Sequence, residues 1–173
     1  MMEPRIRIDI AALPSKYTVR RLTVDDLERI YTLSLGNPLF FQYCPPFVTR
    51  ERILEDMSAL PPRMTPEDKY YVGFFQDDKL IAVMDLITNY PDTHTVFIGL
   101  FMMEKSEQGR GIGSSIVREC ARYFKSVGCR YIRLGFAKGN PQSEAFWRKN
   151  GFEPVGIETD NGTYTVVVMR RVL

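Results

Sequence analysis

The sequence predicts a single domain of the α/β class, in an α+β arrangement, with a mixed central sheet of about seven strands and roughly four helices. Three observations support this prediction. Strand-like segments are concentrated after residue 69, a glycine-rich turn joins one of them to a long amphipathic helix, and 173 residues are enough to bury one core. The expected order is strand, two helices, three strands, helix, strand, helix and two strands.

The N-terminal part of the chain contains the first strand and the first helix. Residues 1–16 are expected to form an arm or an extra strand in front of a single domain over 17–173. Strand formers predict the first strand over 17–22, and Thr23, with Asp26 three positions later, predicts the start of a helix. The apolar stripe of this helix comprises Leu27, Ile30, Tyr31 and Leu35.

The segment after this helix is rich in aromatic residues and proline. Gly36-Asn37-Pro38 ends the helix, and residues 39–48 are predicted to form an apolar loop. We expect the loop both to pack on the core and to wall a substrate pocket. Thr49 predicts the cap of a second helix, which Pro61-Pro62 terminates. The apolar stripe of the second helix comprises Ile53, Leu54, Met57 and Leu60.

The second half of the chain alternates strands with two further helices. Asp77-Asp78 lies between two strand-like runs and predicts a hairpin. A third strand ends at Met103, and the strand over 131–137 should lie parallel to it because a helical crossover joins the two. Asn161-Gly162 marks the turn of a last hairpin. The remaining predicted elements are strands over 70–76, 79–88, 152–158 and 163–169, and a short helix over 143–150 capped by Ser143.

The stretch Gln108-Gly109-Arg110-Gly111-Ile112-Gly113-Ser114 is the centre of the predicted site. It joins the strand that ends at Met103 to an amphipathic helix. Alternate glycines leave the backbone without β-carbons and permit φ values that other residues resist. The unpaired amides and the dipole at the start of the helix would then favour a phosphate or pyrophosphate. The apolar stripe of the helix includes Ile112, Ile116, Cys120 and Phe124.

The spacing of the glycines distinguishes between known kinds of phosphate-binding turn. A P-loop needs Lys and then Ser or Thr after its second glycine, where this chain has Ile112-Gly113. A dinucleotide fingerprint needs a third glycine in place of Ser114 and an acidic residue at the end of the next strand, which this chain lacks. The stretch instead resembles the Q/R-x-x-G-x-G/A pyrophosphate loop of the GNAT-type, acetyl-CoA-dependent N-acetyltransferases.

A second segment strengthens the resemblance to the GNAT family. The run from Asn140 to Phe152 is similar to the family's N-x-x-[S/A]-x-x-[F/L]-Y-x-K-x-G-F segment, and the order of elements from Tyr17 onward is that of the GNAT acyl-CoA N-acyltransferase fold. Trp147 stands where the family has a tyrosine beside the sulfur of coenzyme A. Because an indole N–H cannot protonate a thiolate, we interpret Trp147 as a packing residue that shapes the thioester channel.

The departure at this position leaves the general acid open. Ser143, a water molecule or Tyr164 are the candidates. A thiol has a pKa of about 8.5, so the thiolate of coenzyme A is an acceptable leaving group near neutral pH and a general acid adds a limited factor.

The resemblance implies a reaction and a set of contacts. The acetyl group of acetyl-CoA would pass directly to a primary amine, and no metal is expected. The backbone from Phe101 to Met103 would meet the pantetheine and the thioester, and a backbone amide, placed at Phe101, would stabilise the oxyanion. Arg110, Lys138 and Arg148 either contact the outlying phosphate of coenzyme A or are solvated surface charges. The implied cofactor contacts are Phe101, Met102, Met103, Gln108, Gly109, Arg110, Gly111, Ile112, Gly113, Ser114, Asn140, Ser143 and Trp147.

The acceptor side needs a base, because an ammonium must lose a proton before it attacks. Asp85 is one candidate, since a carboxylate among apolar strand residues needs a reason and burial would raise its pKa. Glu104, just after the strand, is the other. His94, the single histidine, ranks below both and is favoured as a turn residue. The expected residues of the amine pocket are Phe41, Tyr43, Tyr90 and Tyr164.

Composition limits the partners of the chain. A net charge of +2 gives no basic footprint for nucleic acid, and no apolar run approaches the roughly 18 residues of a membrane helix. The N-terminus does not resemble a signal peptide, and three cysteines without C-x-x-C spacing predict reduced thiols and no zinc site. We therefore expect a cytoplasmic protein that binds neither nucleic acid nor membrane.

Several functions stay open at this point. The first choice is an N-acetyltransferase for a small amine or an amino-acid-like metabolite, with a homodimer left open. A polyamine or an aminoglycoside is a further possible acceptor. A protein or peptide amine could instead be the acceptor. A non-catalytic acyl-CoA-binding or sensing module is the competing class, for which the missing tyrosine is the hint. A nucleotide-binding protein that is no transferase is a third class, which NAD or ATP rather than coenzyme A would stabilise.

Overall fold

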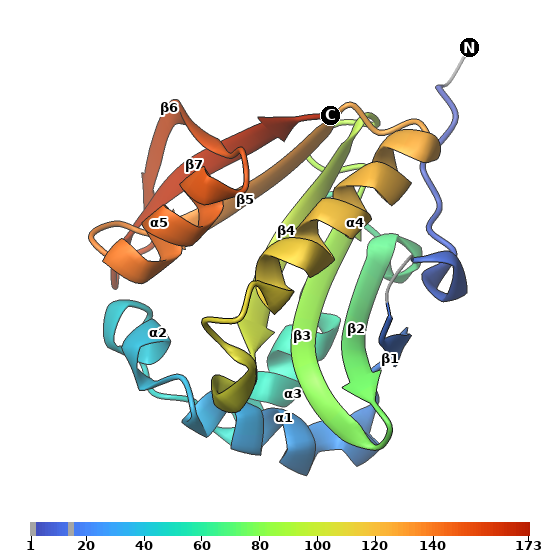
Figure 1. Cartoon of the computed structure of the whole chain (residues 1–173). Coiled ribbons are helices and arrows are strands. Elements are labelled where there is room, and N and C mark those ends of the chain that lie inside the picture. Colours follow the sequence, from blue (N-terminus) through green and yellow to red (C-terminus); the bar gives the residue numbers. More distant parts are fainter. Residues whose placement is uncertain (1–2, 14–15) are drawn as a thin grey trace.

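The structure is a computed structural model that describes residues 3–13 and 16–173 (Figure 1). Its strands are β1 (Thr18–Arg21), β2 (Lys69–Gln76), β3 (Lys79–Thr88), β4 (Thr95–Met103), β5 (Tyr131–Ala137), β6 (Glu153–Asp160) and β7 (Thr165–Val172). Its α-helices are α1 (Leu27–Leu35), α2 (Pro38–Tyr43), α3 (Arg50–Ser58), α4 (Ile112–Ser126) and α5 (Pro141–Lys149). Short 3-10 turns lie at Ile10–Ala12, Val24–Asp26, Pro66–Asp68 and Lys105–Glu107.

The strands form one mixed sheet of seven in the order β1-β2-β3-β4-β5-β7-β6. β4 and β5 run parallel, and all other neighbouring strands are antiparallel. This confirms the predicted α/β class, the number of strands and the parallel pair on either side of the long helix.

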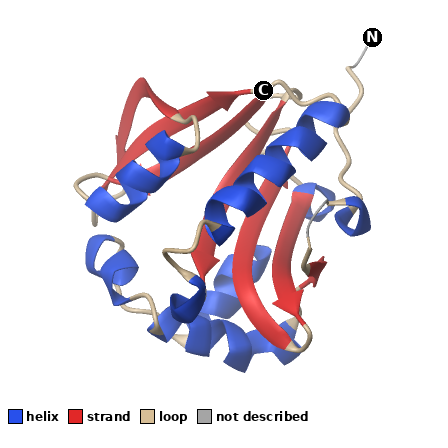
Figure 2. Cartoon of the chain, in the orientation of Figure 1, coloured by secondary structure: helices blue, strands red, loops and turns tan. Residues whose placement is uncertain are grey.

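Helices cover both faces of the sheet (Figure 2). α4 packs on one face through Ile116, Cys120 and Phe124, none of which is more than 2% exposed. α1 and α3 cover the other face through Ile30 and Ile53. The apolar residues of α4 recur every four positions, so burying that stripe fixes the helix against the strands and aims its N-terminus at the end of β4.

β4 and β5 are paired only near their beginnings. Four residue pairs join them, over 95–98 of β4 and 131–134 of β5, and the two strands then diverge (Figure 1). Gly99 follows at once and has no counterpart in β3, which makes it a β-bulge. A bulge bends its strand and increases the local twist, so β4 changes direction where the gap to β5 opens.

The described residues form five α-helices, one more than predicted. The additional helix is α2, which lies in the segment that we predicted as a loop. It begins at Pro38 and is six residues long. Proline suits the first position of a helix because its N–H is not needed there and its φ is already helical. Because α2 is so short, the periodicity of its apolar residues gives no helical signal.

Several details of the predicted helices were wrong. Leu60 was expected in the stripe of the second helix and Pro61-Pro62 at its end, whereas α3 ends at Ser58. Leu35 and Leu54 were expected in buried stripes and are 46% and 39% exposed. Leu35 is the last residue of α1, and on α3 it is Ile53 that faces the sheet. Ser143 was expected to cap the short helix, whereas the cap is Asn140, whose Oδ1 accepts hydrogen bonds from the N–H groups of Gln142 at 3.1 Å and Ser143 at 3.2 Å.

The N-terminal segment is tied to the loop after β3 by buried polar contacts. The side-chain oxygen of Asn89 accepts a hydrogen bond from the N–H of Ile6 at 2.7 Å, and its amide nitrogen donates to the carbonyl of Ile6 at 3.0 Å. Arg5 pairs with the fully buried Asp68 at 2.6 Å. Residues 3–13 contain one 3-10 turn and no strand, and the domain boundary at residue 17 stays a prediction.

Within the described ranges, none of the helices combines the length and the apolar character that crossing a membrane requires.

Candidate active site

Two cavities lie on either side of β4 where it separates from β5. The first, which we call the α4 cleft, has a volume of about 380 Å³ and lies between the end of β4, the start of α4 and α5. The second, which we call the charged pocket, has a volume of about 470 Å³ and lies between β2, β3, β4 and the helices α1, α2 and α3. The two cavities meet at Phe40 and Met102, which line both.

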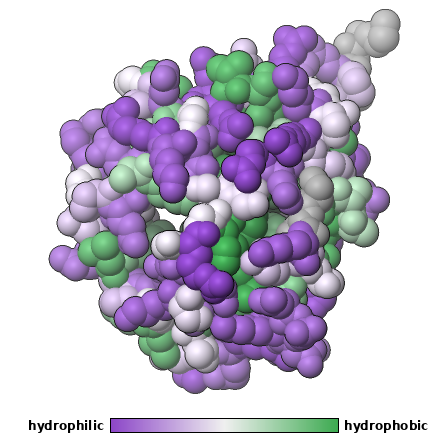
Figure 3. Space-filling view, in the orientation of Figure 1, coloured by the Kyte–Doolittle hydropathy of each residue, from purple (hydrophilic) through white to green (hydrophobic). Residues whose placement is uncertain are grey.

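A smaller cavity of about 90 Å³, which we call the strand gap, lies where β4 and β5 diverge. Gly99 and Leu100 line both the strand gap and the charged pocket, and Ser143 and Trp147 line both the strand gap and the α4 cleft. Two ligands, one in each large cavity, could therefore touch through the sheet. On the face shown in Figure 3, the surface is hollowed near the middle of the molecule, and apolar surface is exposed there between polar side chains.

The glycine turn at the start of α4 is built to leave its backbone exposed. Gly109 and Gly111 have φ values of +74° and +77°, which side chains disfavour. A Cβ added at either residue would meet no atom of the described residues within 4 Å, and both residues line the α4 cleft. Gly111, the N-cap residue, offers no side-chain hydrogen bond to the first turn, and no acidic residue lies there. The first amides of α4 are thus available to an anion.

Two side-chain amides fasten this turn to the end of β4. The amide nitrogens of Asn37 and Gln108 donate to the carbonyl of Met103 at 2.9 and 3.0 Å, and Gln108 also donates to the side-chain oxygen of Asn37 at 2.8 Å. The resemblance implied a cofactor contact for Gln108, and its side-chain amide holds the turn in place. Asn37 was missed, because the sequence Gly36-Asn37-Pro38 was interpreted only as the end of a helix.

The wall between the α4 cleft and the strand gap is aromatic. Trp147 is 7% exposed, and its ring packs edge-on against Phe146 and Phe152 with ring centroids 4.9 and 5.1 Å apart. The ring of Phe101 lies 6.1 Å from that of Trp147. This placement agrees with a packing role for Trp147.

The predicted cofactor contacts, with the exception of Arg110, all line the α4 cleft. The side chain of Arg110 is 64% exposed and lies outside it. Lys138 and Arg148 are paired on the surface with Glu158 at 2.9 Å and Glu144 at 3.2 Å. The three cations therefore sit as surface charges in this structure.

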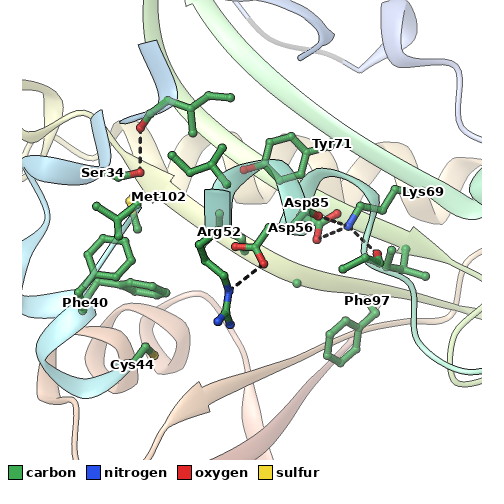
Figure 4. A pocket seen from close by; sticks show the side chains of 18 of the residues that line it. Ser34, Phe40, Cys44, Arg52, Asp56, Lys69, Tyr71, Asp85, Phe97 and Met102 are labelled. Carbon is green, nitrogen blue, oxygen red and sulfur yellow. Dashed lines mark hydrogen bonds and ion pairs between the residues drawn. The ribbon is translucent and has the colours of Figure 1, made fainter. Parts of the chain in front are cut away.

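The charged pocket contains four charged side chains among apolar walls (Figure 4). Lys69 lies 3.0 Å from Asp85 and donates two more hydrogen bonds, to the carbonyls of Asp56 at 2.7 Å and Ala59 at 2.8 Å. All three N–H groups of its ammonium are therefore used. The Nε of Arg52 lies 3.3 Å from the carboxylate of Asp56.

The carboxylate of Asp85 is paired on one side only. Lys69 binds Oδ2, whereas Oδ1 is buried and has no hydrogen-bond partner among the residues that the structure describes. Burial raises the pKa of Asp85 to about 6, although Lys69 opposes the shift. A Cβ at Gly99 would lie 2.7 Å from Oδ2, so only glycine at the bulge lets the carboxylate lie against β4 beside the strand gap.

Comparison with known proteins identifies the family. Residues 27–152 match the family model described as acetyltransferase (GNAT) family. This chain belongs to the GNAT family. Members of the family use acetyl-CoA, and the α4 cleft of this GNAT protein has the glycine turn expected for such a donor.

Solved structures show the same fold. An acetyltransferase from Thermus thermophilus is 20% identical with a TM-score of 0.70, over 92% of this chain and 98% of that one. A Salmonella typhimurium acetyltransferase that modifies the N-terminal serine of ribosomal protein L7/L12 is 18% identical with a TM-score of 0.69, over 95% and 99%. The PaiA N-acetyltransferase of Thermoplasma acidophilum, in complex with coenzyme A, is 19% identical with a TM-score of 0.62, over 92% and 100%. Comparison with curated protein sequences gave no significant match.

The other two candidate bases of this GNAT protein line none of the three cavities described above. Glu104 accepts a hydrogen bond from the N–H of Ser106 at 2.7 Å, and its contacts with Ser106 lower the pKa of Glu104. His94 precedes β4 at the opposite end from the glycine turn and lies 3.3 Å from Glu3. Of the three residues considered, Asp85 alone faces a cavity.

The predicted amine-pocket residues divide between the cavities. Phe41 and Tyr90 line the charged pocket, and Tyr164 lines the strand gap. Tyr43 lines none of the three cavities; its ring lies 3.8 Å from where a Cβ would stand at Gly139. The hydroxyl of Tyr164 lies beside the thiol of Cys44, and burial together with that thiol raises the pKa of Tyr164.

Three charged residues of the pocket were missed from the sequence: Arg52, Asp56 and Lys69. Arg52 and Asp56 stand four positions apart on α3, which is typical of an ordinary surface pair and gave no signal. Lys69 did give a signal in the sequence, because it is a charged residue at the start of an apolar strand and Asp85 is a charged residue within the next one. Two opposite charges in neighbouring buried strands are expected to pair.

Proposed function

We propose that this GNAT protein transfers the acetyl group of acetyl-CoA directly to a primary amine of a small-molecule acceptor. The observation that supports the proposal most is the meeting of the two cavities at the strand gap. One begins at an uncapped glycine turn, and the other contains a buried carboxylate oxygen without a partner in the described part of the chain. A donor and an acceptor held in these cavities would react as neighbours, without a bimolecular encounter.

On the donor side, the residues of the α4 cleft would hold coenzyme A. The first amides of α4 would bind the pyrophosphate. Beyond residue 98 the edge of β4 that faces β5 has no strand partner among the described residues, so its backbone groups can pair with the amides of the pantetheine. An N–H group at Phe101 would hold the thioester oxygen as its negative charge develops. Acetyl-CoA supplies the acetyl group as a thioester of a good leaving group.

On the acceptor side, Asp85 would take a proton from the ammonium. A pKa of about 6 suits this role, because the carboxylate is ionised at neutral pH and is still basic enough to accept a proton. The freed amine forms the C–N bond while the C–S bond breaks, and Asp85 releases the proton that it took to solvent. Tyr164, which lines the strand gap, would protonate the departing thiolate. The nitrogen then loses a second proton, which returns through solvent to the Tyr164 oxygen.

The size and walls of the charged pocket favour a small molecule. A volume of about 470 Å³ lies within the range of small-molecule sites, and its lining is mostly apolar and aromatic. The Salmonella typhimurium relative acts on a protein N-terminus, so peptides belong in any test. A cytoplasmic location, a homodimer, and the lack of nucleic-acid or membrane partners stay predictions.

The donor site is tested by comparing two matched glycines. Gly111 and Gly156 have φ values of +77° and +83°, and a Cβ at either would meet no atom within 4 Å. Alanine at each therefore carries a similar backbone cost, on the order of 1 kcal/mol. Of these two glycines, only Gly111 lines the α4 cleft. We expect Gly111→Ala to weaken coenzyme A binding at least tenfold in calorimetry, and Gly156→Ala to leave it unchanged. Equal affinities would reject the site.

Activity is tested by following free thiol from acetyl-CoA with a panel of amines and short peptides. Turnover of at least one small amine, lost in Asp85→Asn by about 100-fold or more, is the expected result. Tight binding of coenzyme A without turnover of any amine would favour the acyl-CoA-sensing module.

A further inference from the structure

The charged pocket indicates the chemical class of the acceptor, an inference that rests on the proposed function. We propose that the acceptor is a zwitterion of the amino-acid kind, with an apolar or aromatic body, whose amine lies at Asp85 and whose carboxylate is bound by Arg52. The argument follows from which polar groups of the pocket are already satisfied and which are not.

Lys69 cannot bind an anion of the acceptor. Its three N–H groups are used by the Asp85 carboxylate and by the carbonyls of Asp56 and Ala59, at 2.7 to 3.0 Å. It is also 7% exposed. Lys69 therefore holds Asp85 and the end of α3 in place, and has no donor left for a ligand.

Arg52 is in the opposite situation. Its single side-chain hydrogen bond in the described structure is the weak one from Nε to Asp56 at 3.3 Å, and both terminal nitrogens are without a partner there. The side chain is 54% exposed and lines the charged pocket. In Figure 4 the guanidinium extends into the open space between Cys44 and Phe97. A guanidinium with free terminal nitrogens presents the planar fork that binds a carboxylate in bidentate fashion.

The amine end is fixed by the one buried side-chain acceptor that has no hydrogen-bond partner among the described residues. Oδ1 of Asp85 is buried without a hydrogen-bond partner, and a buried lone carboxylate oxygen is costly unless a donor fills the site. An ammonium there would be next to Gly99 and the strand gap, where the acetyl group has to arrive. Among the described residues, Asp85, whose Oδ1 lacks a hydrogen-bond donor, and Arg52, whose terminal nitrogens lack an acceptor, thus line the same cavity.

The charge balance of the pocket also favours a zwitterion. Arg52 and Lys69 offset Asp56 and Asp85, so the pocket is neutral in sum. A zwitterion preserves this balance and pairs both free groups. A plain amine would leave the terminal nitrogens of Arg52 without a partner, and a diamine would place a second cation close to Arg52, which is repulsive.

The rest of the lining suits an apolar body. The rings of Tyr90 and Phe97 meet edge to face at 5.4 Å, and those of Phe40 and Phe41 do so at 5.0 Å. All four residues line the charged pocket. Such walls bury an aliphatic or aromatic side chain and offer few hydrogen bonds to a polar one.

The experiment uses pairs of amines that differ only in the carboxylate. Phenylalanine is compared with phenethylamine and phenylalaninamide, and leucine with isopentylamine, while putrescine and a tetrapeptide represent the other classes. Each is assayed for kcat/KM with acetyl-CoA on the wild type, Arg52→Gln, Arg52→Lys and Arg122→Gln. Arg122 is an exposed arginine on α4 and controls for the loss of a charge.

The wild type should prefer the carboxylate member of a pair. Arg52→Gln should lower kcat/KM for it by 10- to 100-fold and leave the decarboxylated partner nearly unchanged, because one bidentate, charge-assisted pair is lost. Arg52→Lys should restore part of the loss, and Arg122→Gln should keep the wild-type preference. Arg52 is largely exposed, so its variants are expected to fold, which circular dichroism checks.

The outcomes separate the two proposals. Turnover of decarboxylated amines, putrescine or the tetrapeptide in preference to amino acids, or equal losses on both members of a pair in Arg52→Gln, would overturn the zwitterion while the acetyltransferase stands. Binding of coenzyme A without turnover of any amine would overturn the proposed function itself, and the assignment of the acceptor with it.

Discussion

Replacing Asp85 by Asn should change how the stability of the protein depends on pH. The pKa of Asp85 is raised from 3.8 to about 6 by burial. The folded state therefore binds the Asp85 proton more tightly than the unfolded chain does. The contribution of this proton to stability is complete below pH 3.8 and is lost as the pH rises through about 6, above which the penalty of the buried charge stays constant.

The magnitude follows from the shift in pKa. Each unit corresponds to about 1.4 kcal/mol, so ionising Asp85 in the folded state lowers the free energy of unfolding by up to about 3 kcal/mol. The side chain is only 13% exposed, so solvent screens this penalty little. The Asn variant cannot ionise at this position and lacks the penalty throughout.

Urea unfolding at several pH values between about 4 and 7.5 measures the effect. The stability of the wild type minus that of Asp85→Asn should fall by up to about 3 kcal/mol between pH 4 and pH 7, since contributions from all other groups cancel in the difference. Asp78→Asn, in the exposed turn between β2 and β3, is the control and should give a flat difference. A flat or rising difference for Asp85→Asn would show that its pairing with Lys69 outweighs burial, and would refute the reasoning.

Three further substitutions test the site. Lys69→Met removes the cation beside Asp85, so the pKa of Asp85 should rise further and the acidic limb of the pH–rate profile should move upward from about 6, as measured by kcat/KM between about pH 5 and 9. Tyr164→Phe should lower kcat at pH 7 by less than about tenfold, and the loss should shrink by about pH 9, where the thiolate leaves unaided. Asn37→Ala removes the hydrogen bond to the Met103 carbonyl, so urea unfolding should show a loss of about 1–3 kcal/mol and calorimetry a weaker affinity for coenzyme A.

The fold was largely predictable because its strongest signals are local. A strand, a glycine-rich turn and a helix with a four-residue apolar period follow one another within 95–126, and the structure has them in that order. The order of the seven described strands in the sheet is a long-range property that spacing alone does not specify, and only the two hairpins and the parallel pair of β4 and β5 were predicted from it. Helix ends were predicted less well, as Asn140 illustrates, because several residue types cap a helix equally well.

The pairing of Lys69 with Asp85 shows why the charged pocket was harder to predict. If the strand pairing next to the turn between β2 and β3 continued without a bulge, Asp85 would lie opposite Tyr70. Lys69 would then point to the other face of the sheet. A bulge between Phe74 and Phe75 shifts the register by one residue, so that Tyr71 faces Asp85 and Lys69 shares its side of the sheet. No residue type in either strand predicts that bulge.

The helix α2 was missed for a different reason. Six residues cannot show a helical period, and such a short helix is stable only through tertiary contacts. Its aromatic residues did predict a pocket wall, and Phe40 and Phe41 are part of one. The aromatic composition of this segment therefore predicted that it lines a pocket, but it did not predict that the backbone is helical.

The ring of Phe40 borders both large cavities and the strand gap. A ligand that contacted this ring from one cavity would limit the positions that the ring can take toward a ligand in the other cavity. Occupancy of the two large cavities would then be thermodynamically linked, and a ligand in one cavity would change the affinity for a ligand in the other by the same factor in both directions. At equilibrium, the fraction of protein that holds both ligands would not depend on which ligand binds first.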